Sequence, residues 1–325
     1  MTRRLLVTGG AGFIGSAYAR ALLGPAGPPA VRVTVLDALT YAGSTARLDA
    51  VHDDPRLTFV HGDVCDAPLV DRLAAQHDDI VHFAAESHVD RSIESGAAFA
   101  RTNVLGTQTL LDAALRHGIR TFVQISTDEV YGDLPTGAAT EDTALSPNSP
   151  YAASKAAADH LALAHHRTHG LDVRVTRCSN NFGPYQHPEK LIPRFLTALL
   201  DGGTVPVYGD GLQIRDWLHV DDHVRGIELV RTAGRPGRTY NIGGGTSLTN
   251  LDLTRRLLTL CGAGPERIRH VTDRKGHDRR YAVDHTRITE ELGYRPGGDF
   301  ERRLADTARW YREHTDWWTS LHAAA

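Results

Sequence analysis

The sequence lacks any long apolar run. None of its apolar stretches approaches the ~20 residues that a membrane-spanning helix needs. The run at the start, Leu5 to Val7, is too short for the core of a signal peptide and leads directly into glycines, so we interpret it as a first strand. We therefore expect neither a membrane span nor a secretory leader.

Cysteine and net charge are also scarce. The three cysteines, Cys65, Cys178 and Cys261, are odd in number and widely separated, so we expect no disulfide framework and a reducing, cytoplasmic location. A net charge of −3 gives no reason to expect a nucleic acid or a membrane surface as partner.

Histidine is plentiful, but metal-ligand spacing is absent. The chain has 18 histidines, yet the adjacent pair His165-His166 has no His-x-x-x-His or paired-cysteine partner. We therefore expect no metal site.

The first ~180 residues alternate short apolar runs with helical stretches, as parallel α/β proteins do. The composition, with 41% apolar and 23% charged residues, is typical of a soluble globular protein. A length of 325 residues predicts one large domain with a smaller lobe. The expected strands are Leu5–Thr8, Val31–Leu36, Leu57–Val60, Ile80–Phe83, Phe122–Ser126 and Val173–Arg177, and the clearest helices are Ala67–Gln76, Ala98–His117 and Tyr151–Thr168. The pattern predicts an α/β fold with a Rossmann-like, doubly wound parallel sheet.

The pattern changes after residue ~180, where a loop rich in Gly and Pro begins. Shorter elements follow: helices near Glu189–Leu200, Val220–Thr232 and Asn250–Cys261, strands near Val205–Tyr208, Asp216–His219 and Thr239–Ile242, and a last helix ending in Trp317-Trp318. We expect residues 1–180 to form an NAD-binding domain that residues ~220–245 rejoin. Residues 181–219 and ~246–325 would then form a discontinuous α/β lobe that binds the substrate.

A glycine turn follows the first strand and opens a helix. Gly9, Gly12 and Gly15 have the spacing that permits a tight turn and lets backbone N–H groups approach a pyrophosphate. Asp37 ends the second strand, where a carboxylate accepts hydrogen bonds from ribose hydroxyls and repels a 2′-phosphate, which favours NAD over NADP. A structural turn and a capping Asp are the alternatives.

Asp63 and Val64 end the third strand and are positioned to meet the adenine, although a plain turn explains them equally well on position alone. We expect further cofactor contacts from residues beside these strand ends, namely Phe13, Ile14, Leu39, Thr40, Ala84 and Ala85.

Tyr151 and Lys155 are four residues apart on an expected helix, so they share one face. A tyrosine with a pKa of ~10 is a poor base at neutral pH, and a nearby ammonium favours its phenolate. Downstream of the glycine turn, this pair indicates an enzyme that transfers a hydride.

Several segments together resemble the extended short-chain dehydrogenases/reductases, and within them the dTDP-glucose 4,6-dehydratases. Besides the glycine turn they are Ala84–Arg91, Ser126–Gly132, Ser149–Lys155 and Asn180–Pro193. Thr127, Asp128 and Glu129 set the chain apart from the epimerases of the superfamily, which usually lack the Asp-Glu pair. Phe182, where the family commonly has Tyr, is a small departure away from the proposed chemistry.

The resemblance implies three steps and a tightly held NAD that is recycled. Tyr151 takes the C4 hydroxyl proton while hydride leaves C4, with Thr127 bonded to the same oxygen and Lys155 contacting the nicotinamide ribose. Glu129 then removes the C5 proton and Asp128 protonates the departing C6 hydroxyl, roles that need different protonation states. Hydride returns to C6 and a proton to C5. A strand-end pair facing solvent is the alternative for Asp128 and Glu129.

The resemblance also supplies a sugar-nucleotide site for dTDP-glucose. Arg215 and Arg274 would bind the diphosphate, since arginine makes bidentate phosphate contacts, and Ser87 would reach the sugar or the nicotinamide. The remaining contacts would come from Asn180, Glu189, Lys190, Leu191, Pro206, Tyr208, Asn250, His277 and Tyr281. Ordinary surface charge is the alternative for the arginines.

The helices Ala98–His117 and Tyr151–Thr168 are rich in Ala and Leu, and in the superfamily such helices commonly pair across a two-fold axis, which implies a homodimer through a four-helix bundle. Three alternatives to the function stay open: a UDP-glucose 4,6-dehydratase, a 4-epimerase, and a non-catalytic NAD sensor on the same scaffold.

Overall fold

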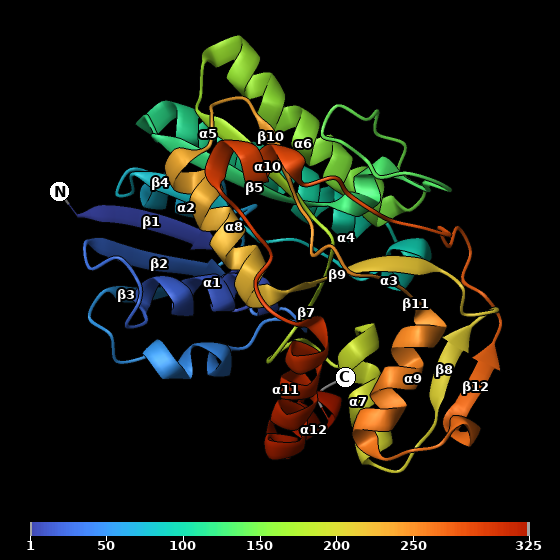
Figure 1. Ribbon diagram of the computed structural model, residues 1–325. Coiled ribbons are helices and arrows are strands. Elements are labelled where there is room, and N and C mark those ends of the chain that lie inside the picture. The colour runs from blue at the N-terminus through green and yellow to red at the C-terminus, as the bar shows by residue number, and fades with distance from the viewer. Residues whose placement is uncertain (1, 324–325) are drawn as a thin grey trace.

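A seven-stranded parallel sheet forms the centre of the protein (Figure 1). The computed structural model describes residues 2–323, so the ends of the expected regions, Met1 and residues 324–325, lie outside the described residues. The order of the strands is β10-β6-β5-β4-β1-β2-β3, and every neighbouring pair is parallel. Their bounds are β1 Arg3–Thr8, β2 Val31–Asp37, β3 Leu57–His61, β4 Asp79–His82, β5 Thr121–Thr127, β6 Val173–Cys178 and β10 Thr239–Ile242. The Rossmann-like fold expected from the sequence is confirmed.

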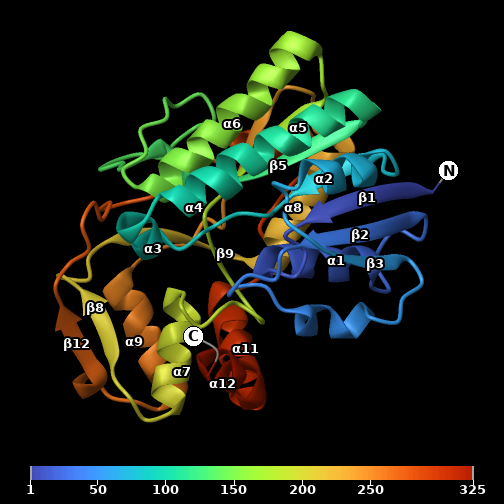
Figure 2. The same cartoon turned by 180° about the vertical axis from the view of Figure 1, so that it is seen from behind.

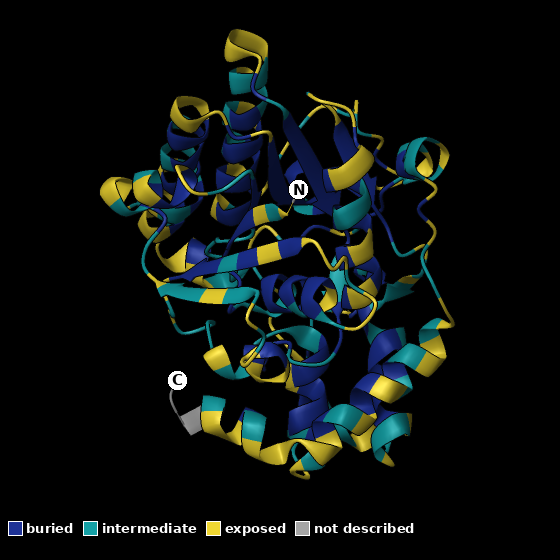
Figure 3. Ribbon diagram, turned by 90° about the vertical axis from the view of Figure 1, so that its left-hand side faces the viewer, coloured by how far each residue is buried: buried dark blue, intermediate teal, exposed yellow. Residues whose placement is uncertain are grey.

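Helices cover both faces of this sheet (Figure 2). Side chains of α1 (Phe13–Leu23), α8 (Val220–Ala233) and α10 (Thr286–Leu292) join one apolar cluster with the strands, and those of α2 (Ala67–Ala74), α5 (Gly106–His117) and α6 (Pro150–His169) join the other. The inner strands β4, β5 and β6 are buried along their whole length because helices cover both faces of the sheet (Figure 3). Polar side chains of these strands, such as Gln124 and Arg177, are buried together with the apolar ones. The position of α10 on the large sheet was not expected, since residues ~246–325 were assigned to the second lobe.

The helix that carries Tyr151 and Lys155 begins at a well-defined cap. The Ser149 hydroxyl accepts a hydrogen bond from the backbone N–H of Ala152, and Pro150 occupies the first turn, where its missing N–H costs nothing. This cap sets the rotation of α6, so that Tyr151 and Lys155 turn into the sheet, and both are buried.

The helix expected over Ala98–His117 is interrupted by a wider turn. A short α4 (Ala97–Phe99) leads into a π-helical segment, Ala100–Leu105, before α5 begins. Inside that turn the buried amide of Asn103 donates to the Glu86 carbonyl and the Ser154 hydroxyl and accepts from the Glu86 N–H. These bonds join the wider turn to the loop after β4 and to α6.

The second lobe lies beside the carboxyl ends of the sheet strands and has its own apolar core (Figure 1). A three-stranded sheet (β7 Asn180–Phe182, β9 Ile214–His219, β11 Ser247–Thr249) and a two-stranded one (β8 Val205–Tyr208, β12 Ile268–Val271) are accompanied by α7 Leu191–Leu200, α9 Asn250–Cys261, α11 Phe300–Glu313 and α12 Thr315–Ala323. The expected helix ending in Trp317-Trp318 is wrong: α11 stops at His314, whose backbone leaves the helical region, and α12 runs through the two tryptophans.

The sequence analysis also made predictions about a membrane span, a metal site and the cysteines. Within residues 2–323 no helix is both long and apolar enough to cross a membrane. In the same part of the chain no three His, Cys, Asp or Glu side chains gather where a metal ion could be held. Cys65, Cys178 and Cys261 are unpaired.

A buried ion pair between α6 and β6 should control stability. Arg177 Nε donates to Asp159 Oδ2 over 2.9 Å, with both side chains at most 4% exposed, and Arg177 Nη1 donates to the Tyr131 hydroxyl. The variant Arg177→Met leaves the buried Asp159 carboxylate without its cation and should lower the free energy of unfolding by ~3–5 kcal/mol. The double variant Arg177→Met/Asp159→Leu should recover most of that loss. Urea denaturation measures both.

The exposed pair Arg255–Asp252 is the matched control, because its side chains are 63% and 48% exposed. Arg255→Met should change the free energy of unfolding by no more than ~1 kcal/mol. Equal losses from Arg177→Met and Arg255→Met would contradict the account of the buried pair.

Candidate active site

A cavity of about 510 Å³ opens along the carboxyl ends of β1 to β6, and a second one of about 180 Å³ continues it into the smaller lobe. Ligands of doubly wound sheets bind at this edge because the loops and helix N-termini that can hold them all emerge there. Glu129, Glu189 and Lys190 line both cavities, so the two form one continuous site.

The glycine turn has the shape that a dinucleotide requires. Gly9 has a φ of +69°, and a Cβ there would come within 2.5 Å of the Ala84 nitrogen. A Cβ on Gly15 would collide with the Gly9 carbonyl, so these two glycines let β1, α1 and the loop after β4 approach closely. A Cβ on Gly12 would meet only the Gly9 carbonyl. The N-terminus of the 11-residue helix α1 therefore faces the cavity and can receive an anion.

Asp37 stands at the end of β2 and holds the turn in place. One of its carboxylate oxygens accepts from the Ala11 N–H over 2.9 Å and the other from the Leu39 N–H over 2.8 Å. A carboxylate has about four acceptor sites, which leaves capacity for the hydroxyls of a ribose. The residues of the large cavity thus fit NAD.

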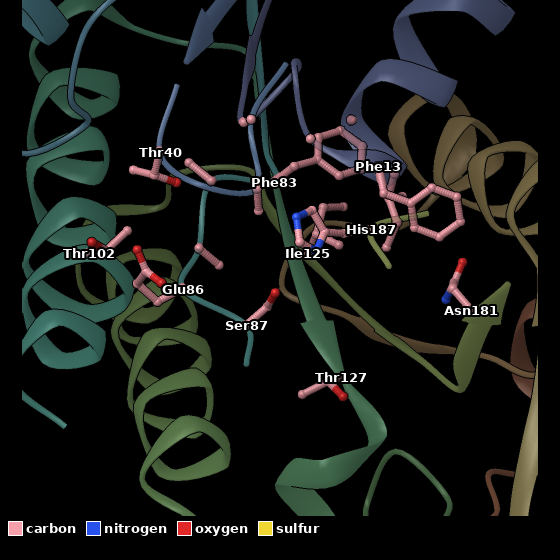
Figure 4. Close-up of a pocket in the computed structure, with 18 of the residues that line it drawn as sticks. Phe13, Thr40, Phe83, Glu86, Ser87, Thr102, Ile125, Thr127, Asn181 and His187 are labelled. Carbon is pink, nitrogen blue, oxygen red and sulfur yellow. The ribbon is translucent and has the colours of Figure 1, made fainter. Parts of the chain in front are cut away.

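Of the expected cofactor residues, Leu39 alone is absent from the cavity wall. Its φ of +48° and its N–H bond to Asp37 belong to the turn after β2. The others line the large cavity: Gly9, Gly12, Phe13, Ile14, Gly15, Asp37, Thr40, Asp63, Val64, Ala84, Ala85, Tyr151 and Lys155. Phe13 and Thr40 are labelled in Figure 4.

Thr127, Asp128 and Glu129 stand where β5 ends and the 3₁₀ turn η3 (Asp128–Tyr131) begins. Figure 4 shows Thr127 at the end of this strand. The Thr127 hydroxyl caps this turn by accepting from the Glu129 N–H, and it donates to Asp128 Oδ1, both over 3.3 Å. Asp128 is 3% exposed, and its Oδ2 has no hydrogen-bond partner within the described chain. Asp128 is one of the residues that line the large cavity.

The two carboxyl groups have different electrostatic surroundings. Burial, followed by the charges of Glu129 and Asp216, raises the pKa of Asp128 well above its ordinary range. Burial also raises the pKa of Glu129, but Arg274, Arg215 and Lys190 oppose that rise. The arrangement therefore favours a protonated Asp128 beside an ionised Glu129.

Tyr151 and Lys155 both line the large cavity, but Lys155 does not set the pKa of the phenol as the sequence suggested. The Lys155 ammonium donates to the Ile125 carbonyl over 2.6 Å. Burial and then the Glu129 charge raise the pKa of Tyr151 well above 10, and the Thr127 hydroxyl opposes them. The phenol is thus neutral in the absence of ligands, because desolvation outweighs the effect of its neighbours.

All the expected sugar-nucleotide residues line the smaller cavity: Ser87, Asn180, Glu189, Lys190, Leu191, Pro206, Tyr208, Arg215, Asn250, Arg274, His277 and Tyr281. They come from the loop after β4, from β7 to β9, and from the segments around α9 and β12. Segments that are up to ~190 residues apart in the sequence therefore line the same cavity.

The two expected diphosphate arginines differ in their present partners. Arg215 is 5% exposed, donates to the carbonyls of Ile214 and Asp278, and lies over the Tyr281 ring. Arg274 instead pairs with Asp90 over 3.4 Å. Arg215 thus adds positive charge to the wall without a carboxylate at ion-pair distance among residues 2–323.

Several lining residues escaped the sequence analysis. Glu86 and His187 line the large cavity (Figure 4). Arg194 and Thr254 line the smaller one. Arg47, in the 3₁₀ turn η1 (Thr45–Val51), is a further member of the large cavity wall. Glu86 lies inside a motif that could have directed attention to it, whereas Arg47 has no such signal because it sits in an expected loop.

Comparison with known proteins agrees with this geometry. The family model described as GDP-mannose 4,6 dehydratase matches residues 6–307. A dTDP-glucose 4,6-dehydratase of Streptomyces griseus is 64% identical over 99% of this chain and 98% of its own, and one of Streptomyces antibioticus is 62% identical over 98% and 95%.

A solved structure extends the similarity to three dimensions. DesIV, a dTDP-glucose 4,6-dehydratase from Streptomyces venezuelae crystallised with NAD bound, is 60% identical and superimposes with a TM-score of 0.97. The match covers 98% of this chain and 99% of that one. The chain therefore belongs to the dTDP-glucose 4,6-dehydratase family.

Proposed function

We propose that the protein is an NAD-dependent dTDP-glucose 4,6-dehydratase that forms dTDP-4-keto-6-deoxyglucose and water. The observation that carries this function is the meeting of Thr127, Asp128 and Glu129 with Tyr151 and Lys155 in one cavity wall. Close relatives with this activity, and a solved relative with NAD bound, support it.

The cofactor would occupy the large cavity, with its pyrophosphate at the N-terminus of α1 and its adenosine ribose beside Asp37. When bound, NAD supplies the acceptor for the hydride from sugar C4 and returns that hydride to C6. We propose that residues 1–180 and ~220–245 hold the cofactor, and residues 181–219 and ~246–325 the sugar nucleotide.

In the first step Tyr151 takes the proton of the C4 hydroxyl, and the Thr127 hydroxyl bonds the same oxygen. Tyr151 would act as the phenolate, which the Lys155 ammonium and the positive charge of bound NAD would favour over the neutral phenol of the ligand-free protein. Lys155 supplies positive charge from the next turn of α6, where it contacts the nicotinamide ribose. The product of this step is a C4 ketone, which makes the C5 proton acidic.

In the second step Glu129 removes the C5 proton while Asp128 gives its own proton to the departing C6 hydroxyl, which leaves as water. The opposed pKa influences on the two carboxyl groups suit this division of roles. In the third step C6 is reduced and a proton returns to C5, so the overall reaction has no net redox change.

The direct test is to incubate the purified protein with dTDP-glucose and, separately, UDP-glucose, without added reductant. We expect dTDP-glucose to lose one water, as detected by mass spectrometry. Loss of water from UDP-glucose alone would mean that the substrate is the UDP sugar and not the dTDP sugar. An unchanged mass with a new hexose epimer by NMR would mean that the protein is a 4-epimerase.

The variants Tyr151→Phe and Glu129→Gln should fail at different steps. Tyr151→Phe removes the base of the first step, so no NADH should form on the enzyme. Glu129→Gln should still allow bound NADH to accumulate, detected by its fluorescence, but should incorporate no solvent deuterium at C5. Asp142→Asn changes an exposed carboxylate outside both cavities and should match the wild type. Normal turnover by Glu129→Gln would refute its role.

The pH dependence of kcat should have two limbs. Glu129 acts ionised, so the rate rises as pH rises through its pKa, and because that pKa is raised the acid limb should lie above 4.5. Asp128 acts protonated, so the rate falls as pH rises through its pKa, which is raised further. Asp128→Asn should lower kcat by ~10²–10⁴-fold and remove the alkaline limb from the residual rate. If the alkaline limb of kcat is unchanged in Asp128→Asn, the titration that causes this limb belongs to another group.

We propose that the enzyme is a cytoplasmic homodimer built on α5 and α6, which pack side by side. Leu105 and Leu115 are 52% and 40% exposed on the outer side of the segment that contains α5, which supports a partner there. Leu105→Glu should halve the mass measured by sedimentation, while Leu212→Glu, at a position 43% exposed in the other lobe, should not.

A further inference from the structure

Arg47 is an unusual residue in the wall of the large cavity. It is 1% exposed and is one of the largest fully buried side chains of the protein. Its Nε donates to the Tyr185 carbonyl over 3.0 Å, and its Nη1 donates to the carbonyls of Ala11 over 3.1 Å and Ala42 over 2.8 Å. One side chain thereby joins three segments: the glycine turn, the loop after β2, and the loop after β7.

The charge of Arg47 has no carboxylate partner. No Asp or Glu among residues 2–323 lies within ion-pair distance of its guanidinium, and its Nη2 is buried without a hydrogen-bond partner. Burial lowers the pKa of Arg47 to about 10, opposed by the Tyr311 and Asp37 charges, so the group stays cationic at neutral pH. A buried and unpaired cation is costly, so a benefit in the ligand-bound state would explain its presence.

The surrounding side chains prevent Arg47 from turning away. The Trp317 ring centroid lies 5.4 Å from the guanidinium carbon, and Trp317 packs edge-on against Tyr185. Arg20 donates to the Arg47 carbonyl over 2.5 Å and lies over the other ring, that of Tyr185. The C-terminal helix α12 thus packs against the guanidinium through Trp317.

The two loops that Arg47 joins are those that would receive the adenosine half of the cofactor. Ala11 lies between Gly9 and Gly12, and Ala42 and Gly43 line the cavity beside Asp37. A pyrophosphate at the N-terminus of α1 would bring negative charge to the wall that contains the unpaired guanidinium. The same residue can therefore set the spacing of the two loops and attract the anion between them.

We propose that Arg47 is a cofactor-positioning residue, which holds the glycine turn and the loop after β2 around the adenosine diphosphate part of NAD and retains NAD on the enzyme through the catalytic cycle. This inference rests on the proposed function, because a cofactor that is reduced and reoxidised within one turnover must not leave between the two steps.

The test measures NAD binding rather than turnover. Wild type, Arg47→Met and Arg47→Lys are purified, their NAD content per protomer is measured after acid release, and the Kd of NAD is measured by calorimetry on cofactor-free protein. Arg47→Met removes both the charge and the carbonyl bonds, so we expect a Kd ~10- to 100-fold higher and largely cofactor-free protein. Arg47→Lys keeps the charge but not the three-way bonding, so its Kd should be intermediate.

A positioning role also predicts a separation of kinetic effects. With saturating NAD, Arg47→Met should recover a kcat within about threefold of wild type and an unchanged KM for the sugar nucleotide, because Arg47 lines only the larger cavity. NAD binding is measured without sugar nucleotide, so it stays informative if dTDP-glucose proves not to be the substrate.

Arg174→Met is the matched control. Arg174 is also a buried arginine that donates to two backbone carbonyls, those of Val230 and Arg231, but it lies outside both cavities. It should lower thermal stability without changing the Kd of NAD. A folded Arg47→Met with wild-type affinity for NAD would overturn the proposal. So would unfolding of both Arg47 variants that millimolar NAD does not reverse, since the residue would then serve the fold alone.

Discussion

The proposed chemistry depends on two adjacent carboxyl groups, Asp128 and Glu129, which follow β5 at the edge of the sheet. Neighbouring residues at a strand end would ordinarily titrate alike, but here the chain turns at once into a 3₁₀ segment and gives the two side chains different surroundings. Asp128 is enclosed by protein and by other acids, while Glu129 faces three cations across the junction of the cavities. The proposed proton donor, Asp128, and the proposed proton acceptor, Glu129, are thus neighbours in the sequence with different surroundings.

The buried cations around the site have the same kind of hydrogen-bond partner. Lys155, Arg215 and Arg47 are all buried, and each donates to backbone carbonyls in place of a carboxylate. Carbonyl oxygens satisfy the hydrogen bonds of a cation without neutralising it. The positive charge therefore stays available to the phosphates of a dinucleotide and of a sugar nucleotide, both of which the proposed reaction requires.

The smaller lobe has its own apolar core and is joined to the larger domain by hydrogen bonds beside the cavities. Its sheets and helices form a separate core, yet Lys190, on the segment that leads into α7, reaches back to donate to the Ser87 carbonyl over 2.7 Å. Tyr41 likewise donates to Glu189 over 3.3 Å across the same gap. These contacts join the two lobes through Ser87, Glu189 and Lys190, all of which line both cavities.

The sequence by itself was enough for the sheet, the glycine turn, Asp37 and the Thr127-Asp128-Glu129 and Tyr151-x-x-x-Lys155 motifs, because each depends on local periodicity or on spacing along one element. It could not predict the wider turn at Asn103 or the burial of Arg47 among three segments, since these depend on partners far away in the chain. It also did not predict the break at His314. It also misjudged which influence sets the pKa of Tyr151. Tertiary structure decided these points, because burial and the hydrogen bonds of distant segments exist only once the chain has folded.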